Sequence, residues 1–158
     1  MKTITPSMIN NDFSPVAKKE LKKIQKNYLE TKAEHATLKA VENAAEDQAC
    51  EELELITEED FEPADHHNSY MLSDADFDKM LTRRQEILLT QGYNCPDKDF
   101  ALSHDAWQRL RRAENDIFKW MHENVRERIG VTEEELDRMV NHWKYSKQLI
   151  ELTLKLTV

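Results

Sequence analysis

The chain contains only two glycines, Gly92 and Gly130, among its 158 residues. Tight hairpin turns depend on glycine, so a fold with many β-turns is disfavoured. Neither glycine nor proline occurs between Pro15 and Pro63, and these two residue types are the strongest interrupters of a helix. The sequence therefore predicts an all-α protein that begins with a long helical segment.

Apolar or small residues recur at helical spacing through that first segment. They are Ala17, Leu21, Ile24, Tyr28, Leu38, Val41, Ala45, Ala49, Leu53 and Ile56. One helix over residues 15–56 would be about 63 Å long at 1.5 Å per residue. Polar residues interrupt the apolar face between 30 and 50, so the sequence leaves open either one helix or a pair.

Three further helices are predicted by their start and stop signals. The signals are Ser73 with Asp76 and Gly92 for the first, Ser103 and Gly130 for the second, and Thr132 with Glu135 for the third. All three tryptophans lie after residue 103. We expect Trp107 and Trp143 to face inward across a helical hairpin around "GVT", with Trp143 as a core anchor.

These signals divide the chain into four parts. We predict a flexible lead-in over residues 1–13, a helical arm over 14–56, an acidic connector over 57–72 and a bundle-like, three-helix core domain over 73–158. No apolar stretch reaches transmembrane length, and no apolar signal segment opens the sequence. We therefore expect a cytoplasmic protein with reduced cysteines.

Charge is distributed very unevenly along the chain. Residues 42–78 hold fourteen Asp or Glu and no Lys or Arg, whereas residues 1–41 carry a net charge of +4 and residues 79–158 a net charge of +1. Such asymmetry is typical of an interaction surface or a solvated segment.

Motifs for catalysis or metal binding are absent from the sequence. His66 and His67 are adjacent and belong to no recognised zinc pattern, and Cys50 and Cys95 form no C-x-x-C motif. There is no glycine-rich loop for a phosphate. We therefore predict that the protein is not an enzyme and uses no metal or cofactor.

The acidic run is the strongest candidate for a binding surface. The candidate partner-binding residues are Glu46, Asp47, Glu51, Glu52, Glu54, Glu58, Glu59, Asp60, Glu62 and Asp65. Carboxylates at regular intervals on a helix resemble the closely spaced charges of duplex DNA. The sequence therefore predicts a small acidic protein that inhibits or regulates a basic, nucleic-acid-binding partner or nucleoprotein complex. Small inhibitors from phages and mobile elements, such as anti-defence proteins and inhibitors of host nucleases, work in this style.

Other interpretations stay open at this stage. The acidic run is also compatible with a solvated spacer, and the helices with a structural or adaptor protein of a larger assembly. Basic stripes at residues 18–26 and 109–120 suggest a DNA-associated regulator, although the negative net charge argues against direct nucleic-acid binding. A homodimer through the long helix is a further alternative, and no association with a membrane is expected.

Overall fold

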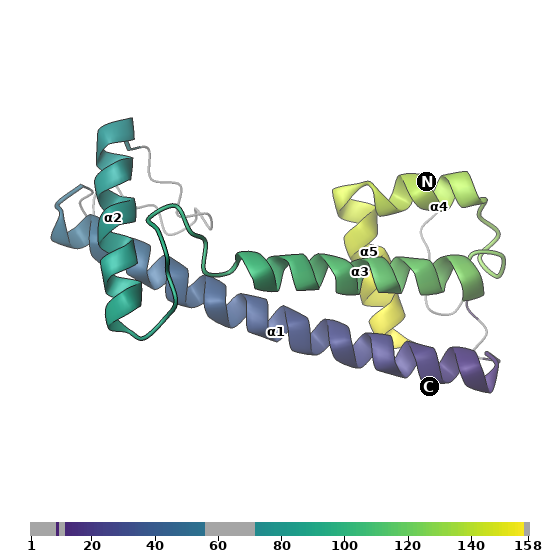
Figure 1. The fold of residues 1–158 in the computed structure, drawn as a ribbon. Coiled ribbons are helices and arrows are strands. Elements are labelled where there is room, and N and C mark those ends of the chain that lie inside the picture. Colours follow the sequence, from purple (N-terminus) through teal and green to yellow (C-terminus); the bar gives the residue numbers. More distant parts are fainter. Residues whose placement is uncertain (1–8, 10–11, 56–71, 157–158) are drawn as a thin grey trace. The chain divides into compact units, whose positions relative to one another are not determined.

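The computed structural model describes residues 9, 12–55 and 72–156. Within these residues it contains five helices and no strand (Figure 1), which confirms the all-α class. The helices are α1 (Pro15–Glu52), α2 (Asp74–Thr90), α3 (His104–Asn124), α4 (Glu133–Val140) and α5 (Trp143–Lys155). Most of the predicted acidic connector, residues 57–71, lies outside the described residues.

The first segment is one continuous helix rather than a pair. Helix α1 has 38 residues, so its axis is about 57 Å long. Ser14 caps its start, because the Ala17 N–H donates to Ser14 Oγ at 3.1 Å. The helix ends before Glu54, whose φ of 54° is left-handed, a conformation common just after a helix.

The chain forms two compact units, which are described separately here. Unit 1 comprises Met1–Ala33 and Gln108–Val158, and unit 2 comprises Glu34–Trp107. Both α1 and α3 contribute residues to both units. The core domain predicted over 73–158 is therefore shared between two units, because helical periodicity shows which face is apolar but not which helix covers it.

Trp120 lies at the centre of the unit 1 core. Its side chain is only 2% exposed, and its Nε1–H donates to the Ala17 carbonyl of α1 at 3.1 Å. Phe13 packs edge-on against its ring, with centroids 5.1 Å apart, and Ile9 belongs to the same core. The segment predicted as a flexible lead-in thus contributes two buried residues to this core.

The last predicted helix is in fact two helices, α4 and α5. Thr132 caps α4 by accepting the Glu135 N–H at 3.1 Å, as the sequence indicated. The break follows Val140, and His142 caps α5 by accepting the Lys144 N–H on Nδ1 at 3.2 Å. Neither glycine nor proline marks this break, so the sequence signals that we used did not reveal it. Helix α3 also ends at Asn124, earlier than the stop signal at Gly130 indicated.

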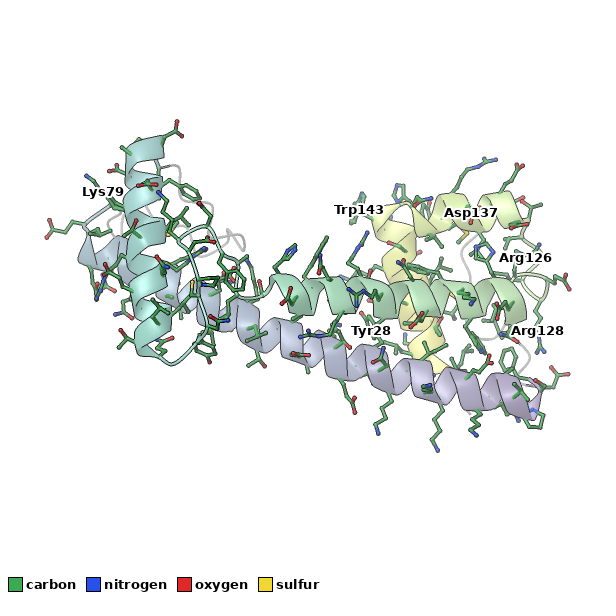
Figure 2. All side chains as sticks on the ribbon, in the orientation of Figure 1. Tyr28, Lys79, Arg126, Arg128, Asp137 and Trp143 are labelled. Atoms are coloured by element: carbon green, nitrogen blue, oxygen red, sulfur yellow. The ribbon has the colours of Figure 1, made fainter. Side chains whose placement is uncertain are left out.

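The prediction that Trp143 and Trp107 anchor the core is wrong. Trp143 is 80% exposed and Trp107 is 47% exposed, and Figure 2 shows Trp143 at the first residue of α5. The prediction placed Trp143 on the apolar face of an unbroken helix. Because a new helix begins at this residue, that face does not continue through it. Phe77 of α2 is likewise exposed.

Substitution of two tryptophans tests this assignment. We expect Trp120→Ala to lower the free energy of unfolding by about 3–5 kcal/mol, because it leaves a large cavity in the core. Trp143→Ala is expected to change it by no more than about 0.5 kcal/mol, as for other exposed positions. The measurement is the midpoint of denaturant unfolding. Equal losses for the two variants would contradict the assignment.

Candidate functional site

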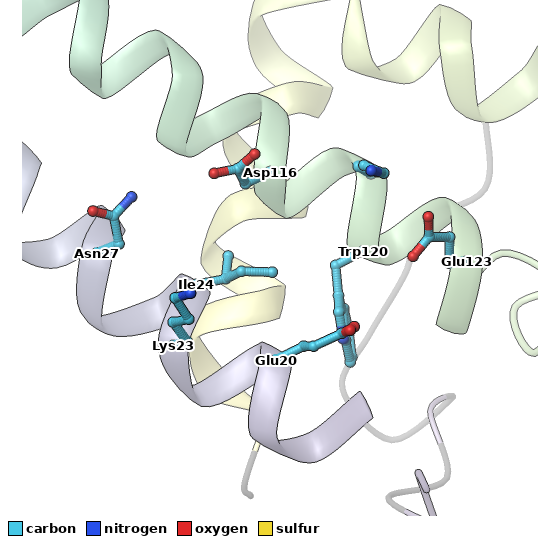
Figure 3. A pocket seen from close by; sticks show the side chains of 8 residues that line it. Glu20, Lys23, Ile24, Asn27, Asp116, Trp120 and Glu123 are labelled. Carbon is cyan, nitrogen blue, oxygen red and sulfur yellow. The ribbon is translucent and has the colours of Figure 1, made fainter. Parts of the chain in front are cut away.

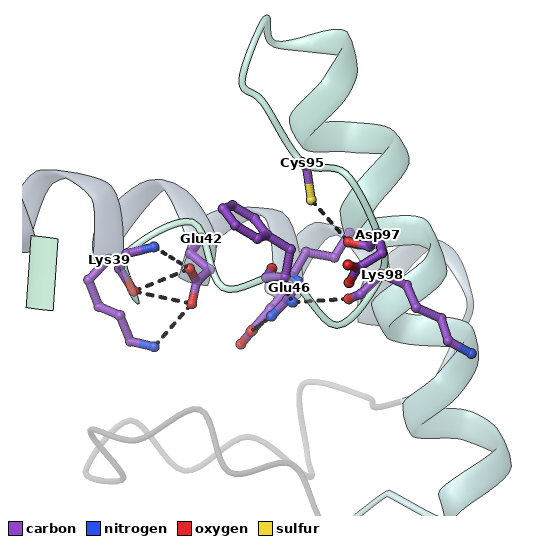
Figure 4. Close-up of polar contacts among 9 residues, drawn as sticks. Lys39, Glu42, Glu46, Cys95, Asp97 and Lys98 are labelled. Carbon is purple, nitrogen blue, oxygen red and sulfur yellow. Dashed lines mark hydrogen bonds and ion pairs between the residues drawn. The ribbon is translucent and has the colours of Figure 1, made fainter. Parts of the chain in front are cut away.

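A buried guanidinium holds together three segments of unit 2. Arg84 of α2 is only 5% exposed. Its Nη1 donates to Glu46 Oε1 of α1 at 2.7 Å, and its Nη2 donates to the carbonyls of Lys98 and Phe100 at 3.2 and 3.0 Å. Glu46 is therefore a structural partner of Arg84 (Figure 4).

Glu42 makes a second buried contact from α1. Its side chain is 2% exposed, and its carboxylate accepts the Ser103 backbone N–H at 3.0 Å and the Ser103 hydroxyl at 3.2 Å. Lys39 Nζ lies 3.3 Å from the same carboxylate (Figure 4). Ser103 was predicted to cap a helix with its side chain, but its hydroxyl donates a hydrogen bond to Glu42 instead.

More exposed ion pairs use further charges of unit 2. Arg83 donates to Glu52 at 2.5 Å and to Glu86 at 2.9 Å, and Lys98 pairs with Asp78. The hydrogen bond from Arg83 is the main reason that the pKa of Glu52 is lowered. Within the described residues, Lys79 is thus the only basic side chain of unit 2 without an ion pair.

The two units carry opposite net charges. Unit 1 has 17 Lys or Arg and 12 Asp or Glu, which gives +5, whereas unit 2 has 5 and 19, which gives −14. Together they account for the net charge of −9. Because most basic residues of unit 2 already have acidic partners, its remaining carboxylates form a surplus that the fold itself does not neutralise.

The ten predicted binding residues fall into three groups. Glu46 and Glu52 are engaged by arginines. Asp47, Glu51 and Glu54 are exposed, and neither Glu51 nor Glu54 forms an ion pair with another described residue. Glu58, Glu59, Asp60, Glu62 and Asp65 lie outside the described residues.

Partial burial raises the pKa of Asp47. The other two exposed residues, Glu51 and Glu54, have no arginine partner among the described side chains, unlike Glu46 and Glu52. The described part of the candidate surface therefore centres on Glu51 and Glu54, at the end of α1.

Sequence reasoning missed the structural roles of Glu42 and Glu46. A signal for Glu42 existed, since it shares a helix face with Ala45 and Ala49, which are both buried. An acid at such a position needs a polar partner from another segment. No comparable signal separates Glu46 from Asp47 or Glu51, because its role depends on Arg84, which is distant in sequence.

Both cysteines are free and buried in the unit 2 core. Burial, followed by the charges of Asp47 and Glu46, raises the pKa of Cys50 to about 11. Burial also raises the pKa of Cys95. Thiols with raised pKa values are poor nucleophiles at neutral pH, because the reactive species is the thiolate.

In the described part of the chain, the His, Cys, Asp and Glu side chains include no group of three that is arranged to hold a metal ion. Its helices include none that is both long and apolar enough to span a membrane. Comparison of the whole chain with known protein families, curated proteins and solved structures found no match.

Two glutamates on α1 provide a matched test of which carboxylates the fold requires. Glu46→Gln should lower the free energy of unfolding by about 3 kcal/mol, because it leaves the buried Arg84 guanidinium without a counter-charge. Glu51→Gln should change it by no more than about 0.5 kcal/mol. Both are measured by chemical denaturation at neutral pH. A loss for Glu51→Gln as large as that for Glu46→Gln would show that the two carboxylates are not distinguished in this way.

The cysteines provide a test that depends on pH. With a pKa of about 11, only about one Cys50 thiol in ten thousand is ionised at pH 7. Neither cysteine should react with a disulfide reagent in the native protein at neutral pH, whereas both should react after denaturation. Because the folded state favours the neutral Cys50 thiol, its contribution to stability is complete below pH 9 and is lost as the pH rises toward 11. Rapid native labelling at pH 7 would contradict the burial of the thiols.

Proposed function

We propose that the protein is a small, non-enzymatic binding protein whose acidic unit 2 regulates or inhibits a basic, nucleic-acid-handling partner. The observation that carries this proposal is the net charge of −14 in unit 2. Four of the five basic residues of this unit already pair with acids of the same unit, so the other carboxylates have few basic neighbours to balance them. Pairing of a few carboxylates supports the fold, whereas a surplus of like charges opposes it by mutual repulsion. A surplus of this size is therefore better explained by binding than by stability.

A basic groove that accepts nucleic acid would attract such a unit for the same reason that it attracts phosphates. Duplex DNA carries one negative charge per about 1.7 Å of its axis. Complementary charge raises the rate of encounter more than it strengthens the final contacts. The buried Arg84–Glu46 pair anchors α2 to α1, so that the carboxylates near the end of α1 project from a fixed scaffold.

The experiment compares two variants with equal changes in net charge. The test variant neutralises five acids of the run to Gln or Asn, and the control neutralises five exposed acids of unit 1 to Gln. The test positions are Glu51, Glu54, Glu58, Glu59 and Asp60, and the control positions are Glu30, Glu127, Glu133, Glu134 and Glu151. Partners captured from host extract by the wild-type protein are identified, purified and measured for binding kinetics against all three proteins.

We expect the captured partner to be a nucleic-acid-binding protein. Its affinity for the test variant should be at least about tenfold lower than for the wild type, mainly through a slower association rate. The control variant should bind like the wild type, and duplex DNA should compete with the wild-type protein for the partner. Binding should weaken as salt shortens the Debye length from about 10 Å at 0.1 M to about 3 Å at 1 M. The proposal fails if the test variant binds the partner as tightly as the control does.

A second candidate function is that of an adaptor in a larger assembly, and the exposure of Trp143 favours it. Tryptophan is enriched at the centres of protein interfaces. Here it lies at the start of α5 with its ring stacked beside His142. The same kinetic measurement separates the two functions, because an adaptor that uses this face loses its partner on Trp143→Ala and keeps it when the acidic run is neutralised.

A further inference from the structure

The junction between α4 and α5 of unit 1 presents an exposed aromatic ring. Trp143 is 80% exposed and lies at the first residue of α5 (Figure 2). The ring of His142 stacks beside it, with centroids 6.1 Å apart and an angle of 20° between the two planes. Because so much of the side chain is exposed, most of the indole surface remains open to a flat ligand.

Short-range contacts hold this pair of rings in place. His142 Nδ1 accepts the Lys144 N–H at 3.2 Å, and the His142 ring also lies against Tyr145, with centroids 4.8 Å apart. Tyr145 in turn packs against the unit 1 core. The Ser146 hydroxyl donates to the Trp143 carbonyl at 3.2 Å. Trp143 therefore starts from a fixed support, which reduces the entropy that is lost when a ligand binds.

The charges that flank this ring in the sequence are positive. Residues 138–150 hold three Lys or Arg and no Asp or Glu. Arg138 lies 4.0 Å from Glu134, whereas Lys144 and Lys147 are exposed and form no ion pair with another described residue. Lys147 follows the tryptophan by four residues and so shares its helix face. A ligand that lies on the indole therefore meets available cations within about one helical turn.

A flat aromatic group that also carries negative charge matches this combination, and a nucleotide has both properties. Nucleic-acid-binding proteins stack bases on aromatic side chains and hold the backbone with positive charge. The faces of a base are covered by its neighbours in a duplex, whereas a single strand can offer them. The chemistry of the junction thus favours a single strand.

Other occupants match the junction less well. A membrane-binding surface buries several neighbouring apolar side chains, and a protein interface surrounds a central tryptophan with well-packed neighbours. Among the described residues of unit 1, the other exposed large hydrophobic side chains are Val16 and Leu29, which both lie on α1. The sequence neighbours of Trp143 are polar and cationic instead.

The groove between α1 and α3 of unit 1 is a poorer site for an anion. It has a volume of about 470 Å³ (Figure 3). Its charged lining residues are Glu20, Lys23, Asp116, Lys119 and Glu123. Three acids and two bases give it a negative balance, so it would not attract a phosphate backbone. The α4–α5 junction is the more favourable surface.

We propose that the α4–α5 junction of unit 1 binds single-stranded nucleic acid, with one base stacked on Trp143 and the flanking phosphates on Lys144 and Lys147. The negative net charge of the chain argues against direct nucleic-acid binding, but that charge belongs to unit 2, whereas unit 1 carries +5. The site lies wholly within unit 1 and does not rest on the function proposed for unit 2.

Binding of labelled oligonucleotides to the purified protein tests the proposal. The probes are short oligomers of thymidine and of uridine nucleotides, and a DNA duplex of the same length. Fluorescence anisotropy at low salt should show binding of both single strands, with the duplex at least about tenfold weaker because its bases cannot stack on the indole. For two phosphate contacts, the logarithm of the affinity should fall with the logarithm of salt concentration with a slope of about −1.4.

Two matched tryptophan variants locate the stacking contact. Trp143→Ala should weaken binding at least about fivefold, which is the lower limit for loss of one stacked base, and Trp143→Tyr should restore most of the affinity. Trp107→Ala should bind like the wild type. Trp107 is an exposed tryptophan that also stacks beside a histidine, but it belongs to the acidic unit 2.

Two charge variants locate the phosphate contacts. Lys144→Glu with Lys147→Glu should weaken binding at least about tenfold and flatten its salt dependence. Lys19→Glu with Lys22→Glu makes the same change in charge on the exposed face of α1 and should have a smaller effect. Circular dichroism of each variant checks that the helices are retained.

Failure of both single strands to bind at low salt would overturn the proposal. Equal affinity for the duplex, or equal losses for Trp143→Ala and Trp107→Ala, would do the same, because stacking on Trp143 would then not hold the ligand. Vesicles of anionic lipid are a further probe, and Trp143-dependent binding of vesicles without binding of oligonucleotides would assign the surface to a membrane instead. None of these results concerns unit 2, whose partner is measured separately.

Discussion

The guanidinium of Arg84 is buried and must keep a negative partner, since an uncompensated buried charge costs several kcal/mol. Glu46 supplies that charge from α1, and two loop carbonyls accept hydrogen bonds from the second terminal nitrogen of the guanidinium. One side chain thereby fixes the register of α1 against α2 and the path of the chain that leads to α3. The binding surface proposed for unit 2 depends on this arrangement, because its carboxylates project from the same part of α1.

Local sequence signals predicted much of the fold correctly. The scarcity of glycine and proline indicated helices, and Ser73 and Thr132 cap the helices that they were expected to cap. Gly92 has a positive φ value just after α2, as its role in ending that helix requires. Gly130 also has a positive φ value, but α3 has already ended at Asn124. These features depend on interactions within a few residues, so they are visible in the sequence itself.

Features that depend on distant segments could not be predicted in this way. The break before α5 has no glycine or proline, and it leaves Trp143 outside the core. Glu46 and Glu51 are the same residue type on one helix, and only the position of Arg84 gives them different roles. The division of charge between +5 and −14 also emerges only when residues 108–158 are grouped with the start of the chain. The candidate surface was therefore predicted as a region, but its structural carboxylates were not separated from its available ones.

Carboxylate footprinting tests this separation most directly. In this method a carbodiimide couples a small amine to accessible Asp and Glu side chains, and mass spectrometry measures the rate at each residue. We expect rapid labelling of Glu51 and Glu54 in the native protein, with Glu42 and Glu46 protected until the protein unfolds. Addition of a purified partner should then protect Glu51 and Glu54. Labelling of Glu42 and Glu46 as fast as Glu51 in the native protein would contradict the account, because the fold would then not distinguish the carboxylates it needs from those it presents.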